Sequence, residues 1–131
     1  MTTSTSLVTG VDFVSVPTTN YDAAMKFYGE VLGLPCSVEY GRIPGAEFET
    51  GNLTLQVFDF TAVGRDNQPN RNPIALHVDD VESARAELES RGVTFEGETI
   101  DSGVCHMAVF EDPDGNVLLL HRRYAPRSSA G

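Results

Sequence analysis

The feature that most constrains the fold is an order of predicted elements that occurs twice along the chain. Each half begins with a strand, continues with a capped helix that ends at a glycine, and closes with three strands. The separation in sequence between the predicted helix caps, Asn20 and Asp80, is nearly the same as the separation between the turns Gly51-Asn52 and Gly115-Asn116. A repeat of this period indicates an internal duplication of one βαβββ unit.

The first unit is predicted over residues 11–58. Residues 11–16 are rich in strand formers, and Asn20 can cap the helix that follows. Apolar side chains then recur at helical spacing before Gly33, namely Ala24, Phe27, Tyr28, Val31 and Leu32. Three short strands are predicted after it, at 36–40, 46–50 and 53–58.

The second unit is predicted over residues 73–123. A strand at 73–78 leads to a helix capped by Asp79 or Asp80 and ended by Gly92, and strands follow at 93–96, 104–110 and 116–121. The last two strands are joined by Asp112-Pro113-Asp114-Gly115, a sequence that favours a type I turn with a glycine bulge. We attribute the acids Glu111, Asp112 and Asp114 to this turn and expect them to be solvated.

Three segments lie outside the predicted units. Residues 59–72 are polar and break the periodicity, so we interpret them as a linker. Residues 1–10 are expected to form a disordered N-terminus and residues 124–131 a flexible tail. The ordered part is therefore expected to be one domain, residues 11–123.

Charge and cysteine content narrow the classes of function. The formal net charge is −10, and such a surface repels nucleic acid and anionic membranes. Cys36 and Cys105 have no disulfide-framework spacing, and the N-terminus lacks the pattern of a signal peptide. No stretch is long and apolar enough to span a membrane. These features predict a cytoplasmic protein whose partner is a small molecule.

The duplicated pattern resembles a known family. Together with AMKFYGEVLGL at 24–34 and DPDGN at 112–116, it is similar to the vicinal oxygen chelate superfamily of glyoxalase I, bleomycin-resistance proteins and extradiol dioxygenases. The resemblance covers roughly residues 11–123. It implies an α+β fold of two tandem βαβββ units whose sheets enclose a cavity, and commonly a homodimer formed by pairing intact chains or exchanging units.

The same resemblance argues against the metal that many members hold. Their ligands are His, Gln or Glu at four strand positions, which here correspond to Phe13 (or Val11), Gln56 (or Leu55), Pro73 and Leu119. Phenylalanine, proline and leucine side chains have no atom that can bind a divalent cation. We therefore expect no metal and no cofactor.

Alternation along the strands predicts which side chains face the cavity. The cavity is expected to be mostly apolar, with Ser15, Gln56, His77, Cys105 and His121 as its polar points. The expected ligand-binding residues are these five together with Phe13 and Met107. Leu55 and Val57 are expected to pack against the helices instead. A buried, inert state is expected for Cys105.

His77 and His121 leave four interpretations open. If their strands are neighbours, the two imidazoles would lie close together and could contact a ligand, transfer protons, or belong to a relocated metal site. The plainer interpretation is a hydrogen-bonded wall or rim residue without chemistry.

Three functions follow from these residues. The preferred one is a metal-independent binding protein that holds a small, partly apolar or aromatic compound, for resistance, sequestration or transport. The second is an enzyme of the same fold (a lyase, isomerase or dioxygenase-like protein) that uses His77 or His121 as its acid and base. The third is a regulatory or interaction module without a ligand. The sequence does not identify the ligand.

Overall fold

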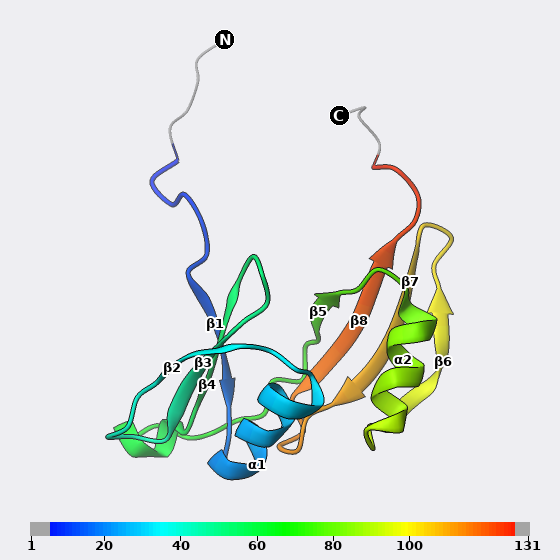
Figure 1. Ribbon diagram of the computed structural model, residues 1–131. Coiled ribbons are helices and arrows are strands. Elements are labelled where there is room, and N and C mark those ends of the chain that lie inside the picture. The colour runs from blue at the N-terminus through cyan, green and yellow to red at the C-terminus, as the bar shows by residue number, and fades with distance from the viewer. Residues whose placement is uncertain (1–5, 128–131) are drawn as a thin grey trace.

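The computed structural model describes residues 6–127, and it confirms an α+β fold of two four-stranded sheet units (Figure 1). The first sheet has the order β1-β4-β3-β2. Its strands are β1 (Phe13–Pro17), β2 (Cys36–Glu39), β3 (Gly45–Glu49) and β4 (Thr54–Phe58). The helical segment between β1 and β2 consists of α1 (Tyr21–Lys26) and η1 (Phe27–Val31). Strand β1 runs parallel to β4.

The second sheet repeats this arrangement with the order β5-β8-β7-β6. Its strands are β5 (Ile74–His77), β6 (Phe95–Asp101), β7 (Cys105–Glu111) and β8 (Val117–Arg123), and α2 (Val81–Ser90) follows β5. Strand β5 runs parallel to β8, as β1 does to β4. The equal strand orders confirm the duplication that the sequence predicts.

The predicted terminal segments fall partly outside the described residues. Residues 1–5 of the predicted N-terminal segment and residues 128–131 of the predicted tail are not described. Within residues 6–127, no helix is both long enough and apolar enough to cross a membrane.

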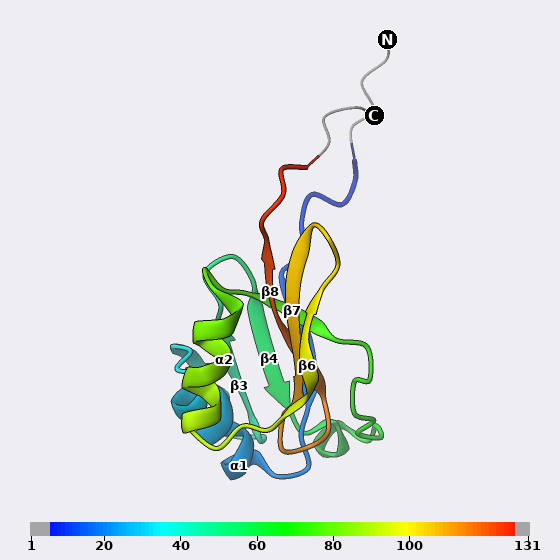
Figure 2. The ribbon, with the colours of Figure 1, turned by 90° about the vertical axis from the view of Figure 1, so that its right-hand side faces the viewer.

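Helices α1 and α2 lie on one side of the pair of sheets, while the connection from β4 to β5 lies on the other side (Figure 2). The helix-facing side chains of both units belong to one hydrophobic core. This core includes Val16, Tyr28 and Leu55 from the first unit and Phe110, Leu118 and Leu120 from the second. The predicted alternation in β4 is confirmed, since Leu55 and Val57 are buried in this core.

The first helix departs from its predicted form after one and a half turns. The cap is as predicted, since the Asn20 side chain accepts a hydrogen bond from the amide of Ala23 at 3.1 Å. From Phe27 onward, however, the backbone is a π-helix, and the Leu32 amide donates to the carbonyl of Phe27. Arg91 of the second unit donates to the carbonyl of Val31 at 2.7 Å, which satisfies an acceptor at the end of the helix.

The strand predicted at 93–96 corresponds to β6, which is longer than predicted. The strand extends over Phe95–Asp101, beyond the predicted end at residue 96. Its pairing with β7 is interrupted between Glu96 and Ile100 and then resumes. Gly97 takes a φ of +60° inside this interruption, which a residue with a side chain adopts only with strain. The sequence pattern therefore breaks at a bulge rather than at the strand end.

The connection over residues 59–72 is more structured than the predicted linker. It begins with the 3-10 helix η2 (Phe60–Val63) and ends in contact with the hairpin formed by β7 and β8. The amide of Val117 donates to the carbonyl of Asn70, and the amide of Asn70 donates to the Asn116 side chain at 2.7 Å. This connection is therefore fixed to the turn before β8.

The turn at 112–115 has the predicted geometry but not the predicted role for its acids. Gly115 has a φ of +88° and its amide donates to the carbonyl of Asp112. Asp112 is only 6% exposed, whereas we expected it to be solvated. Its carboxylate accepts hydrogen bonds from the Tyr28 hydroxyl at 2.7 Å and from the Asn116 side chain at 2.8 Å.

These contacts connect the first helix to the last hairpin. Burial raises the pKa of Tyr28, and the neighbouring Asp112 carboxylate raises it further, so the hydroxyl remains a donor. Asp114 in the same turn accepts hydrogen bonds from Thr18 and Thr19. The acids of the turn therefore bind the two units together.

Candidate functional site

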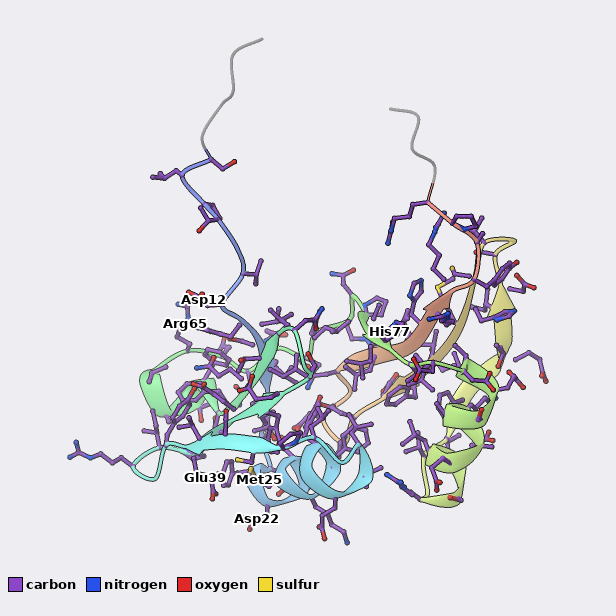
Figure 3. The ribbon with its side chains drawn as sticks, turned by 45° about the horizontal axis from the view of Figure 1, so that its top comes forward. Asp12, Asp22, Met25, Glu39, Arg65 and His77 are labelled. Carbon is purple, nitrogen blue, oxygen red and sulfur yellow. The ribbon has the colours of Figure 1, made fainter. Side chains whose placement is uncertain are left out.

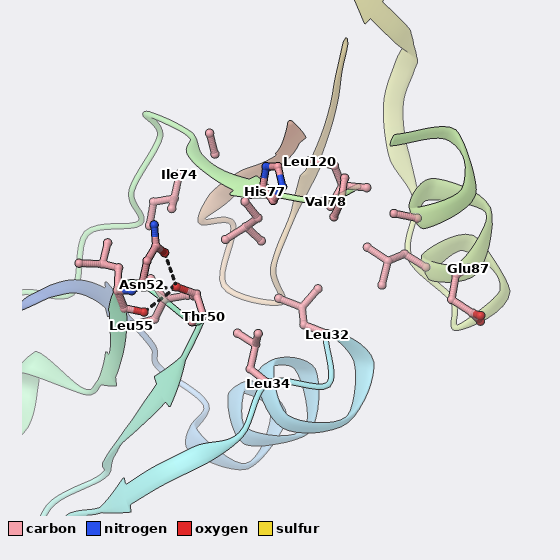
Figure 4. Close-up of a pocket in the computed structure, with 16 residues that line it drawn as sticks. Leu32, Leu34, Thr50, Asn52, Leu55, Ile74, His77, Val78, Glu87 and Leu120 are labelled. Atoms are coloured by element: carbon pink, nitrogen blue, oxygen red, sulfur yellow. Dashed lines mark hydrogen bonds between the residues drawn. The ribbon is translucent and has the colours of Figure 1, made fainter. Parts of the chain in front are cut away.

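A pocket of about 590 Å³ lies between the two units (Figure 4). One wall comes from the end of η1 and from the β3–β4 turn of the first unit, and the other comes from β5 and α2 of the second unit. The apolar lining residues are Leu32, Leu34, Leu53, Leu55, Ile74, Ala75, Leu76, Val78, Ala84, Leu88 and Leu120. The pocket is therefore an apolar hollow at the junction of the two halves of the core.

Polar groups are placed at the two sides of this pocket. Thr50 and Asn52 lie on the side of the first unit, where the Thr50 hydroxyl is hydrogen-bonded to the Asn52 side chain at 3.2 Å. His77 and Glu87 lie on the side of the second unit, and Glu87 forms an ion pair with Arg91 at 3.6 Å. An apolar ligand with one or two hydrogen-bonding groups would match this arrangement.

Only one of the seven predicted ligand-binding residues lines this pocket. His77 lines the pocket, whereas the other six, namely Phe13, Ser15, Gln56, Cys105, Met107 and His121, are not among its lining residues. They lie on the sheet faces that are turned away from the helices, which we call the far faces. Figure 3 shows His77 on β5, at the edge of the second sheet that is turned toward the first.

The far face of the first sheet carries a chain of hydrogen bonds. Ser15 donates to the Gln56 side-chain oxygen at 2.6 Å, and the Gln56 amide nitrogen donates to the Tyr40 hydroxyl at 3.1 Å. Tyr40 in turn donates to the Glu47 carboxylate at 2.5 Å. Burial and the hydrogen bond to Glu47 raise the pKa of Tyr40. Both polar ends of Gln56 are therefore engaged within the protein.

The far face of the second sheet brings the two histidines together. His77 on β5 is the register neighbour of His121 on β8, which confirms that their strands are adjacent. Met107 on β7 is the register neighbour of His121 on its other side. Cys105 is buried, and its Sγ lies 3.1 Å from the Ser102 hydroxyl.

The family metal does not fit the residues at its four positions. Phe13, Pro73 and Leu119 offer no ligand atom, and the Gln56 oxygen already accepts from Ser15. The alternative positions offer none either, since Val11 and Leu55 are apolar. Among residues 6–127, no three His, Cys, Asp or Glu side chains are grouped so that they could hold a metal ion.

Most of the pocket could not be recognised in the sequence. Leu32, Ile74 and Ala84 have the spacing of core residues, and strand or helix periodicity does not distinguish a packed core position from one that borders a hollow. Tyr40 was also missed, although the predicted strand 36–40 included it; in the structure β2 ends at Glu39 and Tyr40 follows it.

Most of the chain matches one protein family. A family model described as the Glyoxalase/Bleomycin resistance protein/Dioxygenase superfamily matches residues 10–120. The protein YaeR of Escherichia coli (strain K12) is 27% identical over 123 residues, which cover 86% of this chain and 95% of YaeR.

Solved structures share the same fold. TnmS3, an antibiotic binding protein from Streptomyces sp. CB03234, superposes with a TM-score of 0.76 at 25% identity, covering 91% of this chain and 99% of TnmS3. Lactoylglutathione lyase from Agrobacterium tumefaciens gives a TM-score of 0.75 at 18% identity, with 87% of this chain and 93% of the lyase covered.

Proposed function

The chain belongs to the glyoxalase/bleomycin resistance protein/dioxygenase superfamily, and from that premise we propose that it binds a small, largely apolar or aromatic compound without a metal ion. The supporting observation is the pocket between the two units. Its volume of about 590 Å³ is typical of pockets for small organic ligands, and apolar residues, mainly leucines, make up most of its lining. The similar chain TnmS3 is an antibiotic binding protein, which agrees with a role in sequestration or transport.

The polar groups at the pocket indicate what the ligand should carry. Thr50 and Asn52 offer hydroxyl and amide groups at one side, and His77 offers an imidazole at the other. Neither arginine nor lysine lines the pocket, and the chain carries a net charge of −10. A neutral aromatic compound with hydrogen-bonding groups therefore fits better than a carboxylate or a phosphate.

Filling the pocket should abolish binding. We expect Ala84→Phe, on the pocket side of α2, to weaken binding of the neutral aromatic dye N-phenyl-1-naphthylamine by more than about tenfold, because one large side chain occupies the space of the ligand. Dye fluorescence measures the affinity. A thermal-shift screen of aromatic metabolites and antibiotics then searches for the natural compound, because a ligand at about 100 times its Kd adds about 2.7 kcal/mol of stability.

Ala86→Phe is the matched control, because Ala86 is exposed on the same helix and does not line this pocket. It should leave dye binding unchanged. Ile74→Trp narrows the pocket from β5 and should act like Ala84→Phe. Equal binding by the wild-type protein and by both pocket variants would contradict this location of the site.

A second candidate function is supported by the pairing of His77 with His121. Two neighbouring imidazoles can act as acid and base near neutral pH, and His77 also borders the pocket. An enzyme of this kind would convert a compound found in the screen, and His121→Gln would stop the conversion. A compound that stabilises the protein and remains unchanged supports the binding function.

We further propose that two chains form a homodimer through the free β1 edges and the far faces of their first sheets, which leaves the far faces of the second sheets uncovered. Strands β1 and β5 are the edge strands that are turned toward each other, and Phe13 on β1 is 50% exposed. Sedimentation velocity should give twice the mass of the chain, and Phe13→Asp should give a monomer. Val63→Asp changes a side chain that is 54% exposed in η2 and should leave the dimer intact. Dissociation by both variants alike would argue against this surface.

The two cysteines support a reducing compartment. Cys36 is exposed on β2, Cys105 is buried on β7, and both are free thiols. An exposed free thiol is typical of proteins kept reduced, so we infer that the chain works in the cytoplasm.

A further inference from the structure

Three side chains with metal-binding atoms lie in one row across the second sheet. The parallel pairing of β5 with β8 places His77 beside His121, and the antiparallel pairing of β7 with β8 places Met107 on the other side of His121. Residues that are direct neighbours across strands have Cβ atoms about 4.5–5.5 Å apart and point to the same face. Two imidazoles and a thioether therefore converge on one patch of the sheet.

This patch lies on the far face, where an ion can reach it. The residues on either side of the row in sequence, Leu76 and Leu120, pack into the core, so the alternation of the strands turns His77 and His121 the other way. The side chain of His77 is 67% exposed, and His121 and Met107 are partly buried. The His77 Nε2 atom lies 3.7 Å from the Asp79 carboxylate, beyond hydrogen-bonding distance, so the imidazole can turn toward the row.

The kind of ligand atom decides the kind of metal. Imidazole nitrogens bind many transition metals, whereas a thioether selects soft ions such as Cu(I). Hard divalent ions need oxygen ligands. The next side chains on the same face are the apolar Ala75, Leu119 and Val109 on one side of the row and Cys105 and Arg123 on the other, so no carboxylate stands among them. We propose that His77, His121 and Met107 form a binding site for Cu(I), which is separate from the family metal position and shares only His77 with the lining of the apolar pocket.

Silver ions provide a test without redox chemistry, because Ag(I) has the same charge and ligand preference as Cu(I). The exposed thiol is removed first by Cys36→Ser. One equivalent of Ag(I) should shift the NMR signal of the Met107 ε-methyl group and leave that of Met25, which lies on α1, unchanged. Met107→Leu assigns the signal and should lower Ag(I) affinity by more than about tenfold.

The histidines provide the matched pair of variants. His121→Gln should weaken Ag(I) binding as Met107→Leu does. His106→Gln should not, because His106 belongs to the opposite face of β7 and stacks on Tyr124 with ring centres 4.9 Å apart. Circular dichroism confirms that each variant is folded.

Three results would overturn the proposal. The Met107 methyl signal could remain in place at one equivalent of Ag(I), or His106→Gln could weaken binding as much as His121→Gln. Binding could also be lost on Cys105→Ser, which would assign the ion to the buried thiol. The dye experiment on the pocket uses different residues, so either proposal can fail without the other.

Discussion

Replacing Asp112 by alanine will lower the free energy of unfolding by about 3 kcal/mol or more, because it leaves several buried donors without an acceptor. The carboxylate accepts from the Tyr28 hydroxyl, from the Asn116 side chain, and from the backbone amides of Asp114 and Asn116 at 2.9 Å each. Urea unfolding followed by circular dichroism measures the loss.

Two variants locate the origin of this effect. Tyr28→Phe removes one donor and leaves the others paired, so it should cost only about 1–2 kcal/mol. Glu111→Ala removes the neighbouring acid, which is exposed and pairs with Arg71 at 3.2 Å; we expect a loss of at most about 1 kcal/mol. If Asp112→Ala and Glu111→Ala had equal effects, the buried network would not be the cause.

Replacing Phe110 by alanine will cost about 3–5 kcal/mol, the usual range for deleting a buried aromatic side chain. Its ring is fully buried, with centroid distances of 6.3 Å to Phe27 in the first unit and 5.1 Å to Phe95 in the second. Because the ring joins the two units, the variant should still unfold in a single transition at a lower urea concentration.

Val109→Ala is the control for this prediction, since Val109 is the next residue on β7 and lies on the far face. We expect it to cost clearly less than Phe110→Ala. Two separate transitions in the wild-type protein would contradict a shared core and would mean that the units are stable independently.

The fold was predictable because its determinants are local. Asn20 caps the first helix, Gly115 closes the last hairpin, and alternation in β4 separates the core-facing residues from the others. The deviations have local physical causes too. The bulge at Gly97 interrupts the pattern of β6, and the π-helix at Phe27–Val31 differs from an α-helix in bonding that periodicity does not reveal.

The candidate site was much less predictable. That the family metal does not fit could be predicted, because the side chains of Phe13, Pro73 and Leu119 have no ligand atoms. The pairing of His77 with His121 could also be predicted, because their strands were expected to be neighbours. The pocket instead depends on the space left between the two units, to which Leu34 and Ile74 contribute as ordinary apolar residues. The role of Asp112 was missed for the same reason, since Tyr28 lies in the other unit.

The bond between Tyr28 and Asp112 also has a consequence for the order of events during synthesis. It joins positions 84 residues apart, so the first helix is complete on the ribosome long before its acceptor is made. Contacts between such distant positions slow folding, because a long loop must close before they form. Until the last hairpin is made, the hydroxyl of Tyr28 can bond only to water, and the arrival of that hairpin would set the time at which the chain becomes native.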